Sequence, residues 1–204
     1  MKLYMLRHGR TLWNEAGKLQ GRTDIPLSEE GRRSALETGE KLKEIPFSAA
    51  FSSPLMRARE TAELILRGRG IPVQTDERLI ELSFGSAEGM LLSDLAEDKQ
   101  PTVRLFAAPE EYIPPAGGES FDSLEARCRS FLDEVILPNE NRWEHVLLVA
   151  HGGTVRGLFS AMFGRASDEI YGCRVQKNCA VNRIDCTAGV FSVDVFAGEY
   201  CDKL

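Results

Sequence analysis

The feature that most constrains the fold is an alternation of short apolar runs with amphipathic helical patterns. The apolar runs have the length of buried strands, and several stretches between them carry apolar residues at helical spacing. Strands that alternate with helices form a mostly parallel sheet covered on both faces. The sequence therefore predicts an α/β protein, a three-layer sandwich with a mostly parallel sheet, one antiparallel edge strand and helices on both faces. The expected strands are residues 2–6, 49–53, 71–75, 145–150, 179–185 and 190–197.

Four helices are expected from their starting signals and apolar faces. Ser28, Ser53 and Ser120 are N-cap candidates, the second followed by a proline at the first helical position. The fourth helix follows Gly152 and ends near Gly164. The expected buried faces consist of Ala35, Leu36, Leu42 and Ile45 in the first helix, Leu55, Ala58, Ala62 and Ile65 in the second, and Leu124, Phe131, Leu132 and Val135 in the third.

The chain is expected to form one domain that spans residues 1–204. A chain of 204 residues can bury a substantial core, and no repeat or low-complexity tract divides it. The tight connection at 188–191 predicts that the last strand turns back antiparallel at a sheet edge. The irregular, proline-containing segment 85–118 is predicted to be an insertion or lid on this domain.

The composition indicates an ordinary globular protein, with 43% hydrophobic and 27% charged residues. No apolar run approaches the roughly 20 residues that cross a bilayer, and the N-terminal stretch is too short for a signal peptide. A net charge of −6 without a basic stripe argues against nucleic acid as a partner. The five cysteines contain no CxxC pair, so reduced thiols in the cytoplasm are expected rather than disulfides or a zinc site.

Chemically capable side chains follow the predicted strands. Ligands of open α/β sheets bind outside the carboxyl ends of the strands, so these side chains are expected to converge there. Each has an ordinary structural explanation when taken alone, and chance explains their joint arrangement poorly. His145 lies at the start of its strand, away from this edge, and is expected to be structural. The converging residues are Arg7, His8 and Asn14 after the first strand, Arg57 after the second, Glu81 after the third, and His151, Gly152 and Gly153 after the fourth.

This set of side chains suits a phosphoryl group. Arginine presents a planar fork of donors that matches phosphate oxygens, and backbone N–H groups at the helix start after Gly153 would add positive charge. A neutral imidazole can attack phosphorus and form a phosphohistidine, which divides one difficult displacement into two easier ones. Nearby cations would offset charge in the transition state. A carboxylic acid could protonate the leaving oxygen and then activate water, so no metal or other cofactor is expected.

The order of the motifs resembles the histidine phosphatase superfamily, in its phosphoglycerate-mutase-like branch. LRHGRTLWN at 6–14 contains the RHG signature, which is a weak tripeptide by itself. Further blocks follow in the family's order and spacing over nearly the whole chain, which makes the resemblance specific. These blocks are LQGRTDIPLSEEG (19–31), FSSPLMRARETAE (51–63), LIELSFGSAEG (79–89), GGES (117–120) and LVAHGGTVR (148–156).

The resemblance implies a role for each matching position. His8 would be the phosphorylated nucleophile and Glu81 the general acid and base. The family commonly has glutamate after RHG, whereas this chain has Arg10, which either points into solvent or adds charge at the pocket rim. The resemblance further implies that Arg7, Arg57 and His151 bind the phosphoryl group, that Asn14 and Gly152 help to hold it, and that Gln20 and Gly21 belong to a substrate-side loop.

The predicted activity is that of a metal-independent phosphomonoesterase acting on a small phosphorylated metabolite. By resemblance, cofactor-dependent phosphoglycerate mutases carry a longer insertion with a lysine and paired arginines that grip the substrate carboxylate. Here residues 82–118 contain two cations, Lys99 and Arg104, against six acids, a net charge of −4, which favours water as the acceptor. The apolar residues of this segment could line a lid or pack the insertion itself; they are Met90, Leu91, Leu92, Leu95, Val103, Leu105, Phe106 and Tyr112.

Two alternatives remain at this stage. One is a phosphoglycerate mutase, and the other is a non-catalytic phosphate-binding module, although such a module usually lacks a histidine or the acid/base. The expected partner is a small phosphorylated substrate rather than nucleic acid or a membrane. A sugar phosphate, a nucleotide-pathway phosphate or a cobalamin-precursor phosphate would fit. The sequence leaves the oligomeric state open, a homodimer included.

Overall fold

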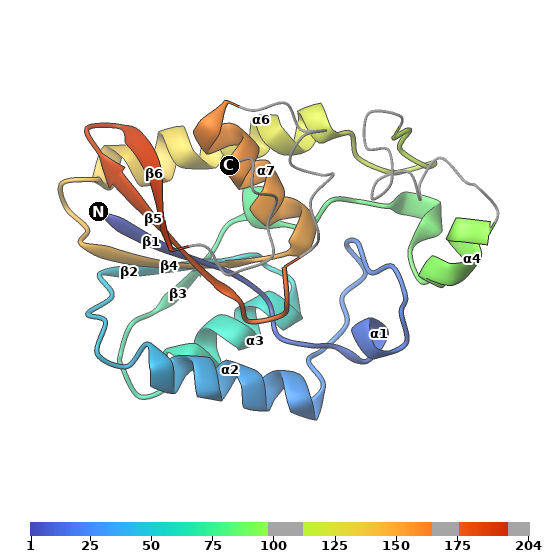
Figure 1. The fold of residues 1–204 in the computed structure, drawn as a ribbon, viewed down its shortest axis with the longest axis horizontal. Helices are drawn as coiled ribbons and strands as arrows, with labels where there is room; N and C mark the ends of the chain where they lie inside the picture. Colours follow the sequence, from blue (N-terminus) through green and yellow to red (C-terminus); the bar gives the residue numbers. More distant parts are fainter. Residues whose placement is uncertain (98–111, 165–175, 196–204) are drawn as a thin grey trace.

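The computed structural model describes residues 1–97, 112–164 and 176–195, and the described part contains a six-stranded sheet with helices on both faces (Figure 1). The strand order is β3-β2-β4-β1-β5-β6, so β4 and β1 lie at the centre. The predicted α/β sandwich is therefore confirmed. The strands are β1 (Lys2–Arg7), β2 (Ala49–Ser52), β3 (Val73–Thr75), β4 (His145–Ala150), β5 (Val181–Thr187) and β6 (Val190–Val195).

The sheet is parallel on one side and antiparallel on the other. β1, β2, β3 and β4 pair in parallel, whereas β5 is antiparallel to β1 and β6 is antiparallel to β5. The predicted hairpin at the edge is confirmed, and the antiparallel part begins one strand earlier than expected. Ala188 and Gly189 adopt positive φ in its turn, where the Glu140 carboxylate accepts both of their N–H groups.

Helices cover the two faces of the sheet in pairs, with α2 and α3 on one face and α6 and α7 on the other (Figure 1). Along β1 the buried side chains alternate, since Leu3 and Met5 pack in one cluster while Tyr4 and Leu6 pack in the other. This double burial explains why the central strands consist of continuous apolar runs. The four helices are α2 (Glu29–Lys41), α3 (Met56–Ile65), α6 (Phe121–Phe131) and α7 (Gly152–Phe163).

Two of the three predicted serine caps are present. Ser28 caps α2 and Ser120 caps α6, each through its hydroxyl oxygen. The prediction for Ser53 and Pro54 was wrong, because α3 begins at Met56 and its N-cap Leu55 provides no side-chain bond. The Met56 N–H instead donates to the Asp24 carboxylate at 2.8 Å, so a distant loop supplies the cap.

The predicted face of α2 is confirmed in part. Ala35 and Leu42 are buried and Ile45 packs against the same core from beyond the end of the helix, whereas Leu36 is 39% exposed. The buried residues of α2 are Gly31, Ala35, Thr38 and Gly39. Small residues are needed on this face because α2 lies close to α3: a Cβ on Gly39 would come within 2.8 Å of the Ile65 carbonyl oxygen.

The other predicted helix ends agree with the structure. α7 ends at Gly164, whose φ of 64° is the left-handed conformation that glycine adopts readily. α6 continues through a π-helical turn, Leu132–Ile136, into a short 3₁₀ turn, Leu137–Asn139, that contains Pro138. The predicted faces of α3 and α6 are largely buried, with Val135 only partly so.

The predicted insertion contributes short elements beside the sheet. These are the 3₁₀ turn η2 (Gly85–Ala87) and helix α4 (Leu92–Glu97), and α1 (Leu12–Glu15) lies at the same end of the molecule (Figure 1). Its apolar residues serve different purposes: Leu95 is buried in the core, Tyr112 packs against it, and Met90 and Leu91 are exposed. Val103, Leu105 and Phe106 fall outside the described residues.

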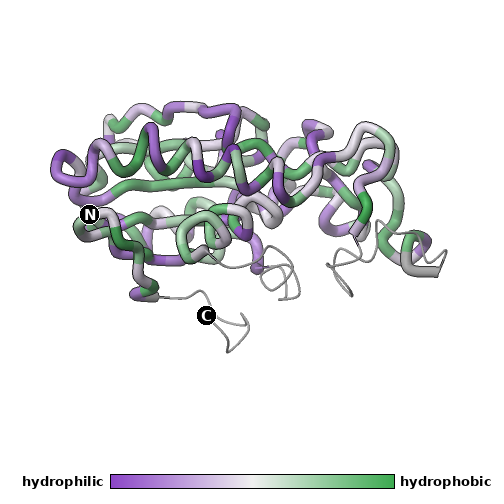
Figure 2. Tube along the Cα trace, turned by 90° about the horizontal axis from the view of Figure 1, so that it is seen from above, coloured by the Kyte–Doolittle hydropathy of each residue, from purple (hydrophilic) through white to green (hydrophobic). Residues whose placement is uncertain are grey.

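The hydropathy of the residues agrees with the arrangement of the sheet between two layers of helices. In Figure 2, hydrophobic and hydrophilic residues alternate along the coiled, helical parts of the trace. Among the described residues, none of the helices combines the length and apolar character that a membrane span requires.

Candidate active site

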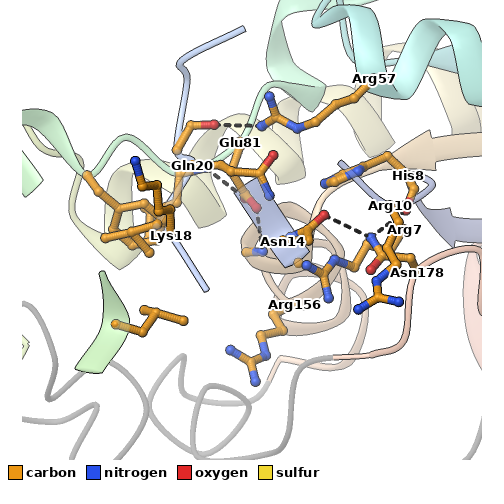
Figure 3. A pocket seen from close by; sticks show the side chains of 17 residues that line it. Arg7, His8, Arg10, Asn14, Lys18, Gln20, Arg57, Glu81, Arg156 and Asn178 are labelled. Atoms are coloured by element: carbon orange, nitrogen blue, oxygen red, sulfur yellow. Dashed lines mark hydrogen bonds between the residues drawn. The ribbon is translucent and has the colours of Figure 1, made fainter. Parts of the chain in front are cut away.

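A cavity of about 340 Å³ opens where the carboxyl ends of β1 and β4 meet the loops around residues 19–23 and 81–84 (Figure 3). Most of the predicted site residues line it, and His151 is fully buried beside it. The lining residues are Arg7, His8, Arg10, Asn14, Lys18, Leu19, Gln20, Gly21, Arg57, Glu81, Leu82, Phe84, Leu92, Gly152, Gly153, Arg156 and Asn178.

The two predicted histidines are neighbours because β1 and β4 pair in register. Arg7 lies opposite Ala150, and the next N–H, that of His8, donates to the Ala150 carbonyl at 2.9 Å. The next residue of each strand is a histidine, and the ring centroids of His8 and His151 lie 5.1 Å apart. The parallel pairing of β1 with β4 thus places the histidine of the RHG motif beside the histidine that precedes Gly152 and Gly153.

A backbone carbonyl fixes the tautomer of His8. Its Nδ1 lies 2.7 Å from the Gly9 carbonyl oxygen, which can only accept, so Nδ1 carries the proton and donates. The lone pair is then on Nε2. Burial lowers the pKa of His8 well below its usual value, and the charges of Arg57 and Arg7 lower it further. His8 is therefore a neutral imidazole at neutral pH.

His151 has a different environment. Neither of its ring nitrogens has a hydrogen-bond partner among the described residues, although the side chain is fully buried. Burial lowers its pKa well below the usual value, and Arg57 and His8 add to this effect. A buried imidazole without partners is costly unless a bound ligand supplies them.

Arg57, in the first turn of α3, is held by the backbone of the loop at 19–23. One guanidinium nitrogen donates to the Thr23 carbonyl at 2.9 Å and another to the Gly21 carbonyl at 2.7 Å. Its side chain is fully buried and Nε has no partner among the described residues. Burial lowers the pKa of Arg57 to about 10, against the opposing charges of Glu81 and Asp24, so it remains a cation at neutral pH.

Two amides border the cavity beside His8. The Asn14 side-chain oxygen accepts from the N–H of Thr11 at 3.2 Å, which leaves the Asn14 NH₂ group to donate elsewhere. Asn178 donates to the His8 carbonyl at 2.9 Å and lies 3.5 Å from the Asn14 oxygen (Figure 3). Arg7 donates to the Gln176 carbonyl at 2.7 Å, so the segment that precedes β5 braces the end of β1.

Glu81 lies at the N-terminus of α7, and this corrects one expectation. Its Oε1 accepts from the N–H groups of Leu82 at 2.9 Å and Thr154 at 3.0 Å, and its Oε2 accepts from the Gly153 N–H at 3.2 Å. The backbone N–H groups at this helix start were expected to add positive charge at a phosphoryl group, but those of Gly153 and Thr154 donate to Glu81 instead. Carboxylates are favoured at helix N-termini for the same electrostatic reason as phosphates.

Arg10 lies at the rim of the cavity and forms an ion pair with Glu30 at 2.9 Å, with 43% of its side chain exposed. Arg10 was expected either to point into solvent or to add charge at the pocket rim. Its side chain is partly exposed and also lines the cavity. The sequence interpretation missed three polar lining residues, namely Lys18, Arg156 and Asn178. Arg156 was part of the LVAHGGTVR block and lies within two turns of Gly152 on α7, which is the signal that would have found it.

These residues correct the expectation of a cation-poor substrate site. The expectation counted charges only within residues 82–118, of which 98–111 fall outside the described residues. The cavity is instead lined by Lys18 and Arg156 in addition to Arg7, Arg10 and Arg57. Figure 3 shows Lys18 and Arg156 well apart from Arg57. Among the described residues, no group of three or more His, Cys, Asp or Glu side chains is arranged to hold a metal ion.

Comparisons with known proteins agree with this geometry. Residues 3–197 match the model of the histidine phosphatase superfamily (branch 1). The 2,3-bisphosphoglycerate-dependent phosphoglycerate mutase 2 of Gloeobacter violaceus is 37% identical over 160 residues, which cover 76% of this chain and 73% of that protein.

Solved structures show the same relationship. Bacillus stearothermophilus YhfR superposes with a TM-score of 0.87 at 32% identity, covering 96% of both chains. A mycobacterial glucosyl-3-phosphoglycerate phosphatase in complex with VO₃ superposes with a TM-score of 0.84 at 30% identity, covering 96% of this chain and 98% of that one. The chain belongs to the histidine phosphatase superfamily, branch 1.

Proposed function

We propose that this protein is a phosphomonoesterase that hydrolyses a small phosphorylated metabolite through a phosphohistidine on His8. The observation that carries the proposal is the state of the His8 ring: Nδ1 is bound to the Gly9 carbonyl, while the ring borders a cavity with the buried Arg57 and with Glu81. A neutral imidazole with a free Nε2 is a nucleophile.

In the first step, Nε2 of His8 attacks phosphorus and the bond to the substrate oxygen breaks. Arg7, Arg57 and His151 bind the phosphoryl oxygens, with Asn14 and Gly152 beside them, and offset the charge of the transition state. Glu81, in its protonated form, gives its proton to the leaving oxygen. The products are the free alcohol and phosphorylated His8.

In the second step, water attacks the phosphorus of phosphohistidine. Glu81, now ionised, takes the proton of that water, and the electrons of the N–P bond return to Nε2. Orthophosphate leaves and the enzyme is regenerated. The proposed site needs no metal ion, since its arginines supply positive charge and the neutral His151 supplies a hydrogen bond. A chelator should therefore leave the activity unchanged.

The substrate's alcohol portion lies beyond the phosphoryl site, next to Gln20 and Gly21. The cavity lining as a whole combines cationic side chains with apolar ones, the apolar ones being Leu19, Leu82, Phe84 and Leu92. Kinship to a glucosyl-3-phosphoglycerate phosphatase supports hydrolysis of a phosphomonoester with an organic alcohol.

A phosphoglycerate mutase is the second candidate. Lys18 and Arg156 line the cavity away from Arg57, where they could meet a second anionic group, and the relative from Gloeobacter violaceus bears this name. In a mutase, a phosphoglycerate hydroxyl replaces water as the acceptor of the phosphoryl group.

A panel of phosphorylated metabolites distinguishes these functions. We expect orthophosphate release from at least one phosphomonoester to exceed the interconversion of 2- and 3-phosphoglycerate by far. Interconversion as fast as the best phosphate release would establish the mutase instead. Orthophosphate binding with neither activity would identify a non-catalytic phosphate-binding module.

A further inference from the structure

The carboxylate of Glu88 joins two loops that border the cavity. Oε1 accepts from the N–H groups of Arg22 at 2.9 Å and Phe84 at 3.1 Å. Oε2 accepts from Thr23 twice, from its N–H at 2.8 Å and from its hydroxyl at 2.6 Å. Glu88 does not line the cavity, and its four donors come from the chain at 22–23 and 84.

The loop that Glu88 holds is the loop that holds Arg57. Thr23 donates to Glu88 through its N–H and hydroxyl, and its carbonyl accepts from Arg57. The Gly21 carbonyl accepts from a second guanidinium nitrogen of Arg57. The backbone of residues 21–23 therefore connects the two groups: its N–H groups donate to Glu88, and its carbonyls accept from Arg57.

The approach of Glu88 to this loop depends on glycine at position 21. Gly21 has a φ of 55°, and a Cβ there would lie 2.1 Å from Oε1 of Glu88. The close contact and the left-handed conformation both require a residue without a side chain. Gly21, predicted as a substrate-side residue, is thus also the residue that admits the Glu88 carboxylate.

We propose that Glu88 is a positioning residue for phosphoryl binding: it fixes residues 21–23, and their carbonyls fix the orientation of the Arg57 guanidinium. The proposal rests on the proposed function, in which Arg57 binds the phosphoryl group. An arginine side chain has many rotamers, and ordering it before the ligand arrives removes that cost from binding. Glu88 therefore acts through Arg57 and not on the substrate.

Orthophosphate affinity, measured by NMR titration so that millimolar constants are accessible, tests the first part of this proposal. Glu88→Gln keeps one acceptor oxygen but places an NH₂ group where a carboxylate oxygen accepted, so about 10-fold weaker binding is expected. Thr23→Val removes only the hydroxyl donor and should weaken binding in the same direction by a smaller factor. Glu60→Gln is the matched control, because Glu60 pairs with Arg32 away from the cavity. The orthophosphate affinity of this variant should stay at the wild-type value.

A double-mutant cycle with Arg57→Lys tests whether Glu88 acts through Arg57. Lysine keeps the charge but lacks the planar fork whose two nitrogens bond the two carbonyls, so Glu88→Gln should change the affinity less than about twofold in that background. If Glu88→Gln does not fold, Thr23→Val takes its place in the cycle.

The outcomes separate the two proposals. Equal losses in the wild-type and Arg57→Lys backgrounds, or wild-type affinity in Glu88→Gln, would overturn the role of Glu88 and leave the proposed function standing. A wild-type protein that binds no orthophosphate would overturn the proposed function and the role of Glu88 with it.

Discussion

The two halves of the cavity are built by different means. The strand-end half is formed by Arg7 at the end of β1 and His8 directly after it, with His151, directly after β4, buried beside them. The loop half is lined by residues 19–21 and Glu81, and Glu88 lies outside this lining. Side-chain to backbone hydrogen bonds hold this half together. Strand register fixes the first half, whereas single side chains fix the second. Attack on phosphorus should therefore depend on the histidines of the first half. The positions of the loop and of Arg57 should depend on the carboxylates of the second half.

The largest expected effect comes from the strand-end half. His8→Ala removes the nucleophile and should lower kcat/KM for phosphate release at least about 10³-fold. Steady-state kinetics on p-nitrophenyl phosphate measure this loss. The control is His145→Gln, at the opposite end of β4, which should retain activity within a few-fold. Turnover of His8→Ala near the wild-type rate would show that His8 is not the nucleophile.

The loop half is tested by Glu81→Gln, whose effect should depend on the leaving group. General acid catalysis contributes roughly 10²–10⁴-fold when the departing alkoxide is a poor leaving group. p-Nitrophenolate leaves without a proton, so the loss of rate should be far larger on an alkyl phosphate than on p-nitrophenyl phosphate. Single-turnover measurements of the phosphorylation step give both rates.

The same variant also tests the structural role of Glu81. Its carboxylate accepts from Gly153 and Thr154 at the start of α7, and loss of that support would slow both substrates alike. Equal losses on the two substrates would therefore assign Glu81 to the helix N-terminus and not to proton transfer.

A smaller effect is expected on stability, from the histidine pair. The pKa values of His8 and His151 are lowered on folding, so well above pH 6.5 both are neutral in the folded and unfolded chains and add no pH dependence to the stability. Below about pH 6.5 the unfolded chain binds protons that the folded chain does not, and stability falls by about 1.4 kcal/mol per pH unit for each histidine.

Urea unfolding of wild type and His151→Asn at pH 7 and pH 5 measures this contribution. The variant should lose about 2 kcal/mol less between the two pH values, because one histidine no longer titrates. An identical pH dependence in the two proteins would contradict the buried, neutral state of His151.

The strand-end half could be predicted from the sequence, and the loop half only in part. Apolar runs locate strands, and the residue after each run lies at the ligand-binding edge, so His8 and His151 follow from local pattern. Glu88 looked like one of six acids in an acidic segment, and nothing local showed that it binds Arg22 and Thr23. Contacts between segments about 65 residues apart depend on how the loops close over the sheet, which no periodicity encodes.

The same reason explains the errors at α3 and at the cavity wall. The cap of α3 comes from Asp24 and not from Ser53, across more than 30 residues of chain. Counting cations within one segment missed Lys18 and Arg156, which reach the cavity from other parts of the sequence. Local rules predicted the sheet and the histidines, while the charge around the substrate depended on tertiary structure.

The central claim, that His8 becomes phosphorylated, is tested most directly by trapping the intermediate. Wild-type protein mixed briefly with substrate and quenched in alkali, where phosphohistidine survives, is digested and mapped by mass spectrometry. We expect one phosphate on the peptide that contains His8, labile to acid and absent from His8→Ala. Phosphate on the peptide that contains His151, or turnover with no phosphorylated His8, would contradict it.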